Sequence, residues 1–249
     1  MTRAPLADLA AGEHRLEGPV AHYLARVLRL QAGSAFVAFD PARGLEADAV
    51  VVWTEGDAVT VRIGPLRAGK APPARPLTWI QGFAKADKCD AVVRDATELG
   101  ATRIVVAATR RSVVKLDEAR AEARASRWSR IAREAARQCG RSEAPVVERP
   151  ITWLEALAQV DTSAARFCLY ENATQPLAPA LFEALGRDAA LAFACGPEGG
   201  LDEAEVAQAQ ASGWAIVSLG PLTLRTETVA AAVLGAVRIW SPLYEERED

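Results

Sequence analysis

The chain falls into two regions with different patterns of hydrophobic and polar positions. In the first, short apolar or alternating runs predict strands at 34–39, 47–52 and 59–63, and apolar residues at helical spacing predict a helix at 19–30. Prolines and glycines then interrupt residues 64–76, a stretch that suits neither a helix nor a strand. We therefore predict a small β-rich domain over residues 1–72, with the linker and the domain boundary in this stretch.

In the second region, residues 73–249, runs typical of strands alternate with helical patterns. The predicted strands are 77–81, 103–107, 166–170, 189–194 and 214–219. The predicted helices are 89–99, 122–139, 177–185, 203–211 and 229–240, with a shorter one at 152–157. Because strands that alternate with helices build parallel sheets with both faces covered, we predict an α/β domain here.

Two loops rich in glycine and proline lie near the C-terminus, at 195–202 and 218–228. Each follows a predicted buried strand and leads into a helical pattern. Glycine lets the backbone approach a ligand closely, and the carboxyl ends of parallel strands are where α/β proteins bind ligands. One such loop is equally well explained as an ordinary turn, but two in close succession favour a shared pocket. The GxGxxG dinucleotide fingerprint and the Walker A loop are both absent from the sequence.

Composition argues against several other classes of protein. The net charge is −3 over 249 residues, so any nucleic-acid surface must be a local patch. The four cysteines and two histidines show no metal-ligand spacing, which argues against structural zinc and against a disulfide scaffold. No apolar run reaches the roughly 20 residues of a membrane helix, and no signal peptide is evident. We expect buried, reduced thiols and a cytoplasmic protein without a metal or a membrane anchor.

The loop motifs carry a resemblance to a known family. Residues 196–200 read Gly-Pro-Glu-Gly-Gly, residues 219–221 read Leu-Gly-Pro, and residues 224–228 read Leu-Arg-Thr-Glu-Thr. Motifs at 22–30, 85–88, 96–100, 111–114, 127–128 and 134–141 match in order and spacing. Together these stretches resemble the RsmE family of SPOUT RNA methyltransferases.

The resemblance implies a fold and an activity. The fold would be a small N-terminal PUA-like β-barrel domain that holds RNA, followed by a SPOUT-type α/β domain with a deep trefoil knot and a parallel sheet covered on both faces. The activity would be methyl transfer from S-adenosylmethionine (SAM), without metal, to N3 of one uridine in 16S ribosomal RNA of the small ribosomal subunit. Two alternatives stay open: another RNA target, such as a ribose 2′-hydroxyl, and a non-catalytic RNA-binding protein of the same fold.

The resemblance also implies which residues form the site. The cofactor would lie against Cys195, Gly196, Pro197, Glu198, Gly199, Gly200, Ser218, Leu219, Gly220, Leu224, Arg225 and Thr226. Arg225 is the candidate for stabilising the uracil anion that forms when N3 loses its proton. Since the second domain contains no histidine, the base would be Glu227, Glu198 or hydroxide. For Glu227, capping of the last helix is favoured over catalysis.

Basic residues in three places are candidates for contact with RNA. They are Arg26 and Arg29 in the first domain, Lys85, Lys88 and Arg111 early in the second, and Arg137 and Arg141 in or just after the helix predicted at 122–139. On a helical wheel, Arg130, Arg133, Arg137 and Arg141 share one side, opposite an apolar side with Trp128 and Ile131. Long arginines suit phosphate contacts, although a solvated basic face is the ordinary alternative.

The last predicted helix, 229–240, is apolar almost all round. A helix without a polar stripe is buried either in a core or between subunits. SPOUT enzymes are typically homodimers whose knot regions pack together. We therefore predict a homodimer with this helix at the interface.

Overall fold

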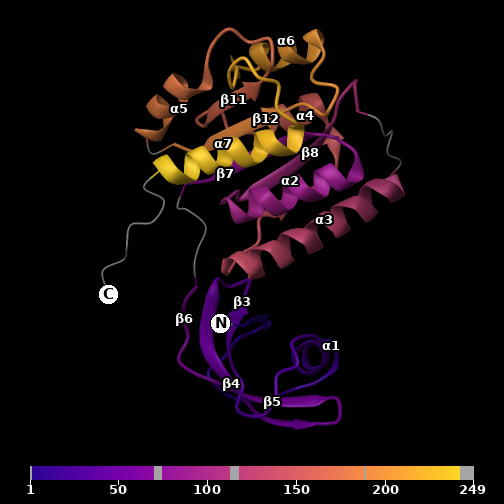
Figure 1. Cartoon of the computed structure of the whole chain (residues 1–249), viewed down its shortest axis with the longest axis vertical. Helices are drawn as coiled ribbons and strands as arrows, with labels where there is room; N and C mark the ends of the chain where they lie inside the picture. The colour runs from indigo at the N-terminus through magenta and orange to yellow at the C-terminus, as the bar shows by residue number, and fades with distance from the viewer. Residues whose placement is uncertain (1, 70–74, 113–117, 188, 242–249) are drawn as a thin grey trace. The chain divides into compact units, whose positions relative to one another are not determined.

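The computed structural model describes residues 2–69, 75–112, 118–187 and 189–241 (Figure 1). The chain forms two compact units. The first contains the residues up to Pro72 together with Ala136–Ala144, and the second contains the remainder from Pro73 onward. The boundary that we place after residue 72 falls at 70–74, outside the described residues. The segment Ala136–Ala144 belongs by its contacts to the first unit, which the pattern of strands and helices does not reveal.

The first unit is built on one six-stranded sheet. Its strands are β1 (Arg3–Pro5), β2 (Gly12–Leu16), β3 (Ala35–Asp40), β4 (Leu45–Glu55), β5 (Ala58–Ile63) and β6 (Arg67–Ala68). The order is β1-β3-β4-β5-β2, with β6 beside β4, and only the pair β1–β3 is parallel. The three strands predicted here are confirmed as β3, β4 and β5. The β-rich character of this domain is therefore confirmed as well.

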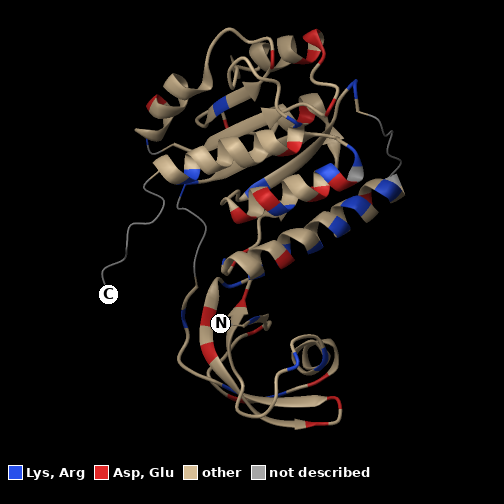
Figure 2. Ribbon diagram, in the orientation of Figure 1, with Lys and Arg blue, Asp and Glu red and all other residues tan. Residues whose placement is uncertain are grey.

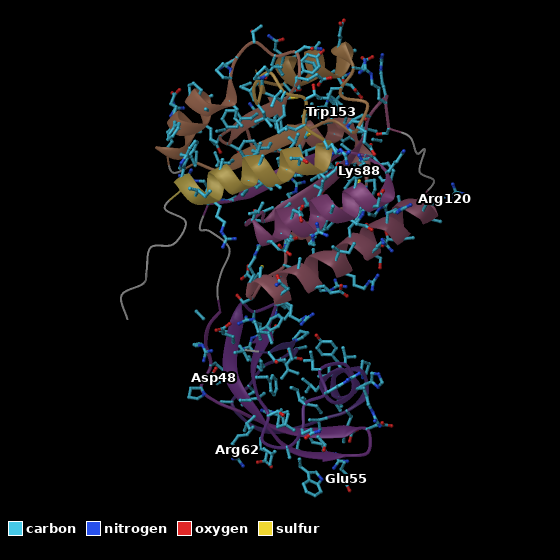
Figure 3. All side chains as sticks on the ribbon, in the orientation of Figure 1. Asp48, Glu55, Arg62, Lys88, Arg120 and Trp153 are labelled. Atoms are coloured by element: carbon cyan, nitrogen blue, oxygen red, sulfur yellow. The ribbon has the colours of Figure 1, made fainter. Side chains whose placement is uncertain are left out.

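Strand β6 lies inside the stretch that we predict to be a linker without strands, so that prediction is wrong at this point. The reason is electrostatic: Arg67 forms ion pairs with Glu46 and Asp48 of β4. The hydrogen bond from Arg67 holds the pKa of Asp48 (labelled in Figure 3) below its ordinary value. A pairing of charges between distant segments leaves no periodic signal in the sequence.

The helix predicted at 19–30 is divided into α1 (Gly18–His22) and a π-helical turn, Tyr23–Val27. Leu24 packs in the core of the first unit, but Val27, one of the apolar residues whose helical spacing predicts this helix, is 59% exposed. A π-helical turn contains more residues than an α-helical turn and so shifts the later side chains around the axis. The backbone bond from Leu28 N–H to the Tyr23 carbonyl spans five residues and closes this turn.

The second unit contains a parallel sheet of seven strands. They are β7 (Leu77–Gly82), β8 (Arg103–Ala108), β9 (Val146–Val147), β10 (Ile151–Thr152), β11 (Ala165–Leu169), β12 (Leu191–Cys195) and β13 (Ala215–Val217). The order is β10-β8-β7-β12-β11-β13, with β9 beside β8. Strand β12 therefore lies between β7 and β11 in the middle of the sheet.

Helices cover both faces of this sheet, as the sequence predicts (Figure 1). One face packs against α2 (Ala86–Glu98), α3 (Glu118–Cys139) as far as Ala135, α5 (Leu177–Leu185) and α7 (Thr226–Trp240). The other packs against α4 (Trp153–Ala158) and α6 (Glu203–Ala211). Alternate strand residues point to the two cores: Trp79 and Phe193 to the first, Ile80 and Ala194 to the second.

Helix α7 buries only one side in this chain. Val229, Val233 and Val237 pack in the core with α2 and the sheet. On the outer side, Ile239 is 79% exposed, and the half-exposed Trp240 stacks on Phe182 of α5 with ring centroids 4.5 Å apart. An apolar helix with an exposed apolar side has surface available for a further partner.

Candidate active site

Four neighbouring strands end at the same edge of the parallel sheet. Cys195 at the end of β12 pairs with Gln81 of β7 on one side and with Leu169 of β11 on the other. Leu169 in turn pairs with Val217 of β13. Because the strands are parallel and in register, the loops that follow all four meet at this edge.

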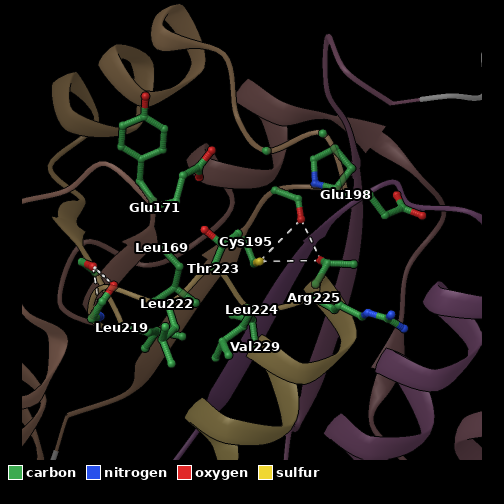
Figure 4. Close-up of a pocket in the computed structure, with 18 of the residues that line it drawn as sticks. Leu169, Glu171, Cys195, Glu198, Leu219, Leu222, Thr223, Leu224, Arg225 and Val229 are labelled. Carbon is green, nitrogen blue, oxygen red and sulfur yellow. Dashed lines mark hydrogen bonds between the residues drawn. The ribbon is translucent and has the colours of Figure 1, made fainter.

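The meeting loops enclose a pocket of about 360 Å³ (Figure 4). All twelve residues that we predict to contact a cofactor line it: Cys195, Gly196, Pro197, Glu198, Gly199, Gly200, Ser218, Leu219, Gly220, Leu224, Arg225 and Thr226. The remaining lining residues are Lys88, Leu169, Tyr170, Glu171, Leu222, Thr223 and Val229. Sequence reasoning assigned Lys88 to RNA, included Leu222 and Thr223 only as part of the predicted pocket loop at 218–228, and missed the other four. Leu169 ends strand β11, and Tyr170 and Glu171 follow it in a loop that has no glycine signature, so only the strand order brings these three residues to the pocket.

The first glycine loop is packed tightly against the end of β7. A Cβ at Gly82 would stand 2.6 Å from the ring nitrogen and from Cδ of Pro197. A Cβ at Gly196 would lie 2.9 Å from the backbone of Gly200 and 3.0 Å from Leu201. These two glycines therefore leave room for protein atoms, whereas the sequence hypothesis assigns Gly196 to close contact with a ligand.

A buried network of polar groups joins this loop to the start of α7. The Gln81 side-chain amide donates to the Gly196 carbonyl at 3.1 Å and to Thr226 Oγ1 at 2.8 Å. Thr226 Oγ1 donates to the same Gly196 carbonyl at 2.8 Å (dashed in Figure 4). Trp79 Nε1 donates to Gln81 Oε1 and so fixes the orientation of the amide. Since satisfied polar networks in a buried site select one arrangement, this network positions both loops of the pocket.

We predict that Thr226→Val lowers the free energy of unfolding by about 1–3 kcal/mol, because valine has nearly the same shape but can neither accept from Gln81 nor donate to Gly196. Denaturant unfolding measures this effect. Thr228→Val, at an exposed position two residues further along α7, is the matched control. It should lower the free energy of unfolding much less. Equal costs for the two variants would contradict a stabilising role for the network.

Charged groups gather at one side of the pocket. Lys88 projects from the first turns of α2 (Figure 3), with Nζ 3.9 Å from Glu198 Oε1 and 3.5 Å from Glu227 Oε2. Glu198 also accepts a bond from the Lys85 backbone N–H at 3.2 Å. Glu227 lies in the first turn of α7, where a carboxylate is favourable to the helix dipole, and α7 has no side-chain capping bond. The two candidate bases are thus held by one ammonium group.

Arg225 is the residue that precedes the first turn of α7. Its side chain is exposed and lines the pocket. Figure 4 shows it on the same side of the pocket as Glu198. It forms no hydrogen bond or ion pair with another described residue. A guanidinium at a pocket wall without a protein partner is available to a bound molecule.

All four cysteines are free thiols, and three are buried, whereas Cys139 is partly exposed, contrary to the prediction for that residue. Cys195 lines the pocket, but burial raises its pKa to about 12. A thiol with such a pKa stays protonated near neutral pH and is a poor nucleophile. The pocket therefore does not favour covalent catalysis through Cys195.

Two of the basic residues predicted to contact RNA lie next to the pocket loops. Lys85 is exposed just before α2. Arg111 is exposed and donates from Nη1 to the Gly199 carbonyl at 2.7 Å. In the first unit, Arg26 and Arg29 are both exposed. Contact of these residues with RNA stays a prediction, and residues 113–114 of the motif that begins at Arg111 lie outside the described residues.

The predicted basic face of the long helix differs from the structure at its end. Helix α3 ends at Cys139, and Arg141 beyond it is 7% exposed, so this arginine is not on a solvated helical face. Gly140, with φ of 88°, turns the chain away from the helical path and moves Arg141 inward. Arg137 remains on the helix, with its guanidinium 5.8 Å from the Tyr23 ring centroid. Figure 2 shows the other basic positions along α3, where Arg130 pairs with Glu134 at 3.9 Å.

In the part of the chain that the structure describes, no group of three or more histidine, cysteine, aspartate or glutamate side chains is placed to hold a metal ion. No helix among the described residues combines the length and the apolar character needed to cross a membrane.

Comparison with known proteins agrees with the fold. The model of the RNA methyltransferase domain family matches residues 70–238, and that of the RNA methyltransferase PUA domain matches residues 16–64. The ribosomal RNA small subunit methyltransferase E of Mycobacterium bovis is 32% identical over 90% of this chain and 85% of its own length. The Bacillus subtilis protein of the same name is 29% identical over 89% of this chain and 88% of its own.

Solved structures agree with these sequence relatives. A ribosomal RNA small subunit methyltransferase E from Neisseria gonorrhoeae, bound to SAM, superposes with a TM-score of 0.86 and 28% identity over 97% of this chain and 98% of its own. The fold and the site thus define an RNA methyltransferase with an N-terminal PUA-like domain. Within that class, the chain belongs to the family of ribosomal RNA small subunit methyltransferase E, which confirms the resemblance to RsmE.

Proposed function

We propose that this chain transfers the methyl group of SAM to N3 of a uridine in 16S ribosomal RNA, within the small ribosomal subunit. The observation that carries the proposal is the pocket itself: its two glycine loops come together at the carboxyl edge of the sheet. The SAM-bound gonococcal relative shares this fold over nearly the whole chain. The names of the curated relatives support ribosomal RNA of the small subunit as the substrate.

The residues of the pocket fit SAM in size and in chemistry. A cavity of about 360 Å³ lies in the range of small-molecule sites. Leu169, Leu219, Leu222 and Leu224 supply apolar surface for an adenine ring. The charged groups Lys88, Glu171, Glu198 and Arg225 can meet the polar and ionic parts of the cofactor. The fit thus combines an apolar wall with a few placed polar groups, as cofactor sites do.

SAM, when bound, supplies an already activated methyl group, so the chain has to orient the acceptor and make it nucleophilic. Arg225 is positioned to stabilise negative charge on uracil O2 or O4 as N3 loses its proton. Glu198, which lines the pocket, and Glu227, which pairs with the same lysine, Lys88, are the candidate carboxylates for accepting that proton. Lys88 holds both and adds positive charge at the same side of the pocket.

Assembly and location belong to the same proposal. The exposed apolar side of α7, with Ile239 and Trp240, supports a homodimer with this helix at the interface. After the edge strand β13 the chain returns to the centre of the sheet, where α7 packs against α2 and β12, and this path supports the trefoil knot. We further infer that the protein acts in the cytoplasm, where ribosomal subunits are found.

The proposal predicts that the purified protein methylates small ribosomal subunits from a strain that lacks its gene. Mass spectrometry of the digested RNA should then find N3-methyluridine in the 16S chain, because bound SAM supplies the methyl group and Arg225 stabilises the uracil anion. Subunits that already carry the modification are the control and should gain no methyl group. Appearance of 2′-O-methyluridine instead would establish the ribose as the target. SAM binding without any methyl transfer would support the alternative of a non-catalytic RNA-binding protein.

A further inference from the structure

The pocket contains one carboxylate that the chemistry above does not use. Glu171 follows β11 by two residues and lines the pocket. Figure 4 shows it across the pocket from Arg225. Its side chain is exposed and forms no hydrogen bond or ion pair with another described residue. A charged group at a pocket wall without a protein partner is a candidate ligand for a bound molecule.

The neighbouring loop leaves space for this carboxylate. A Cβ at Gly200 would stand 2.5 Å from Glu171 Oε1, far inside the contact distance of two atoms. Any residue other than glycine at 200 would therefore push the carboxylate out of its position. The glycine motif and Glu171 thus shape the same part of the wall, although they come from loops after two different strands.

The position of Glu171 indicates which part of the cofactor it faces. Leu169, at the end of the same strand, and Leu219 lie on the apolar side of the pocket, whereas the cations Lys88 and Arg225 lie with Glu198 on the other. Of these cations, Lys88 suits the carboxylate of the methionine part, since Arg225 is assigned to the uracil. An adenine against the apolar side of the pocket would place its ribose next to Glu171. The two adjacent hydroxyls of that ribose can both donate to one carboxylate.

We propose that Glu171 binds the cofactor by accepting hydrogen bonds from the two ribose hydroxyls of SAM. This inference rests on the proposed function, since it assumes that SAM occupies the pocket. It adds a specificity-determining residue to the glycine loops, one that selects for a ribonucleoside.

Calorimetric titration of E171Q with three ligands tests the proposal. SAM and S-adenosylhomocysteine differ in the charge on sulfur, and 5′-methylthioadenosine keeps the ribose but lacks the amino-acid part. We expect E171Q to lose affinity for all three by the same factor, about tenfold, because an amide offers one acceptor oxygen where the carboxylate offers two. E203Q, an exposed position on α6 outside the pocket lining, removes the same charge and should bind all three as the wild type does.

Three results would overturn the proposal. Unchanged affinities in E171Q would remove Glu171 from the cofactor site. A loss for SAM and S-adenosylhomocysteine, but not for 5′-methylthioadenosine, would assign the carboxylate to the ammonium group, and a loss for SAM alone would assign it to the sulfonium. If the wild type binds none of the three ligands, the proposed function itself fails, and the titration shows this before any variant is compared.

Discussion

Arg225→Ala is expected to lower the rate of methyl transfer by about 10²–10³-fold at saturating RNA and SAM, with a much smaller effect on SAM affinity. The guanidinium lines the pocket, is exposed, and has no hydrogen-bond or ion-pair partner among the described residues. It can therefore donate to a uracil oxygen as negative charge develops there. Single-turnover kinetics on small ribosomal subunits measures the chemical step directly.

Two further variants give this prediction its controls. Arg225→Lys should recover little of the rate, because a compact ammonium does not replace a planar two-pronged donor. Arg187→Ala removes an arginine from a surface ion pair outside the pocket and should leave the rate unchanged. If Arg225 binds RNA phosphate instead, alanine should mainly raise the apparent KM for RNA, in a salt-dependent manner. A near-normal rate at saturation would exclude Arg225 from the chemistry.

The α/β domain was predictable because apolar runs typical of strands alternate along the chain with helical patterns. Helices α5 and α6 have the bounds that the pattern predicts, and the five predicted strands correspond to β7, β8, β11, β12 and β13. The elements that were missed are short, and their stability comes from distant partners. Strand β2, Gly-Glu-His-Arg-Leu, has no apolar alternation and forms by pairing with β5. Such pairings depend on the whole sheet and leave no local signal.

The pocket was only partly predictable from the sequence, for a related reason. The residues of the two glycine loops carry a local signature, and all twelve that we name line the pocket. Gln81 and Glu171 lie in stretches without such a signature. They reach the site because β12 is inserted between β7 and β11, an order that the sequence of strands along the chain does not specify. The buried amide of Gln81 and the unpaired carboxylate of Glu171 can therefore be assigned to the site only once the strand order is known.

The two glycine loops also differ in what constrains their glycines, a difference that the sequence motifs do not reveal. Gly196 is surrounded by protein atoms, so a larger residue there should disturb the packing of its own loop. A Cβ at Gly220 would meet no atom of the described residues within 4 Å, but the φ of Gly220 is 112°, a conformation that residues with a Cβ rarely adopt. Its backbone is further fixed by Ser218 Oγ, which accepts from the Gly220 N–H and donates to its carbonyl. Of these two glycines, only Gly220 allows the backbone angle to be tested without a clash in the protein.

Gly220→Val is accordingly expected to lower SAM affinity by one to two orders of magnitude, because about 1–3 kcal/mol of backbone strain shifts the loop at 218–225 away from its binding conformation. Calorimetric titration with SAM measures the effect. Gly56→Val is the matched control: Gly56 also has positive φ, 58°, and a Cβ there would meet no described atom within 4 Å, but it lies in the turn between β4 and β5 of the first unit. Both variants should lose similar stability, so a loss of SAM binding confined to Gly220→Val would arise from the pocket. Unchanged affinity in Gly220→Val would show that the conformation of this loop does not determine cofactor binding.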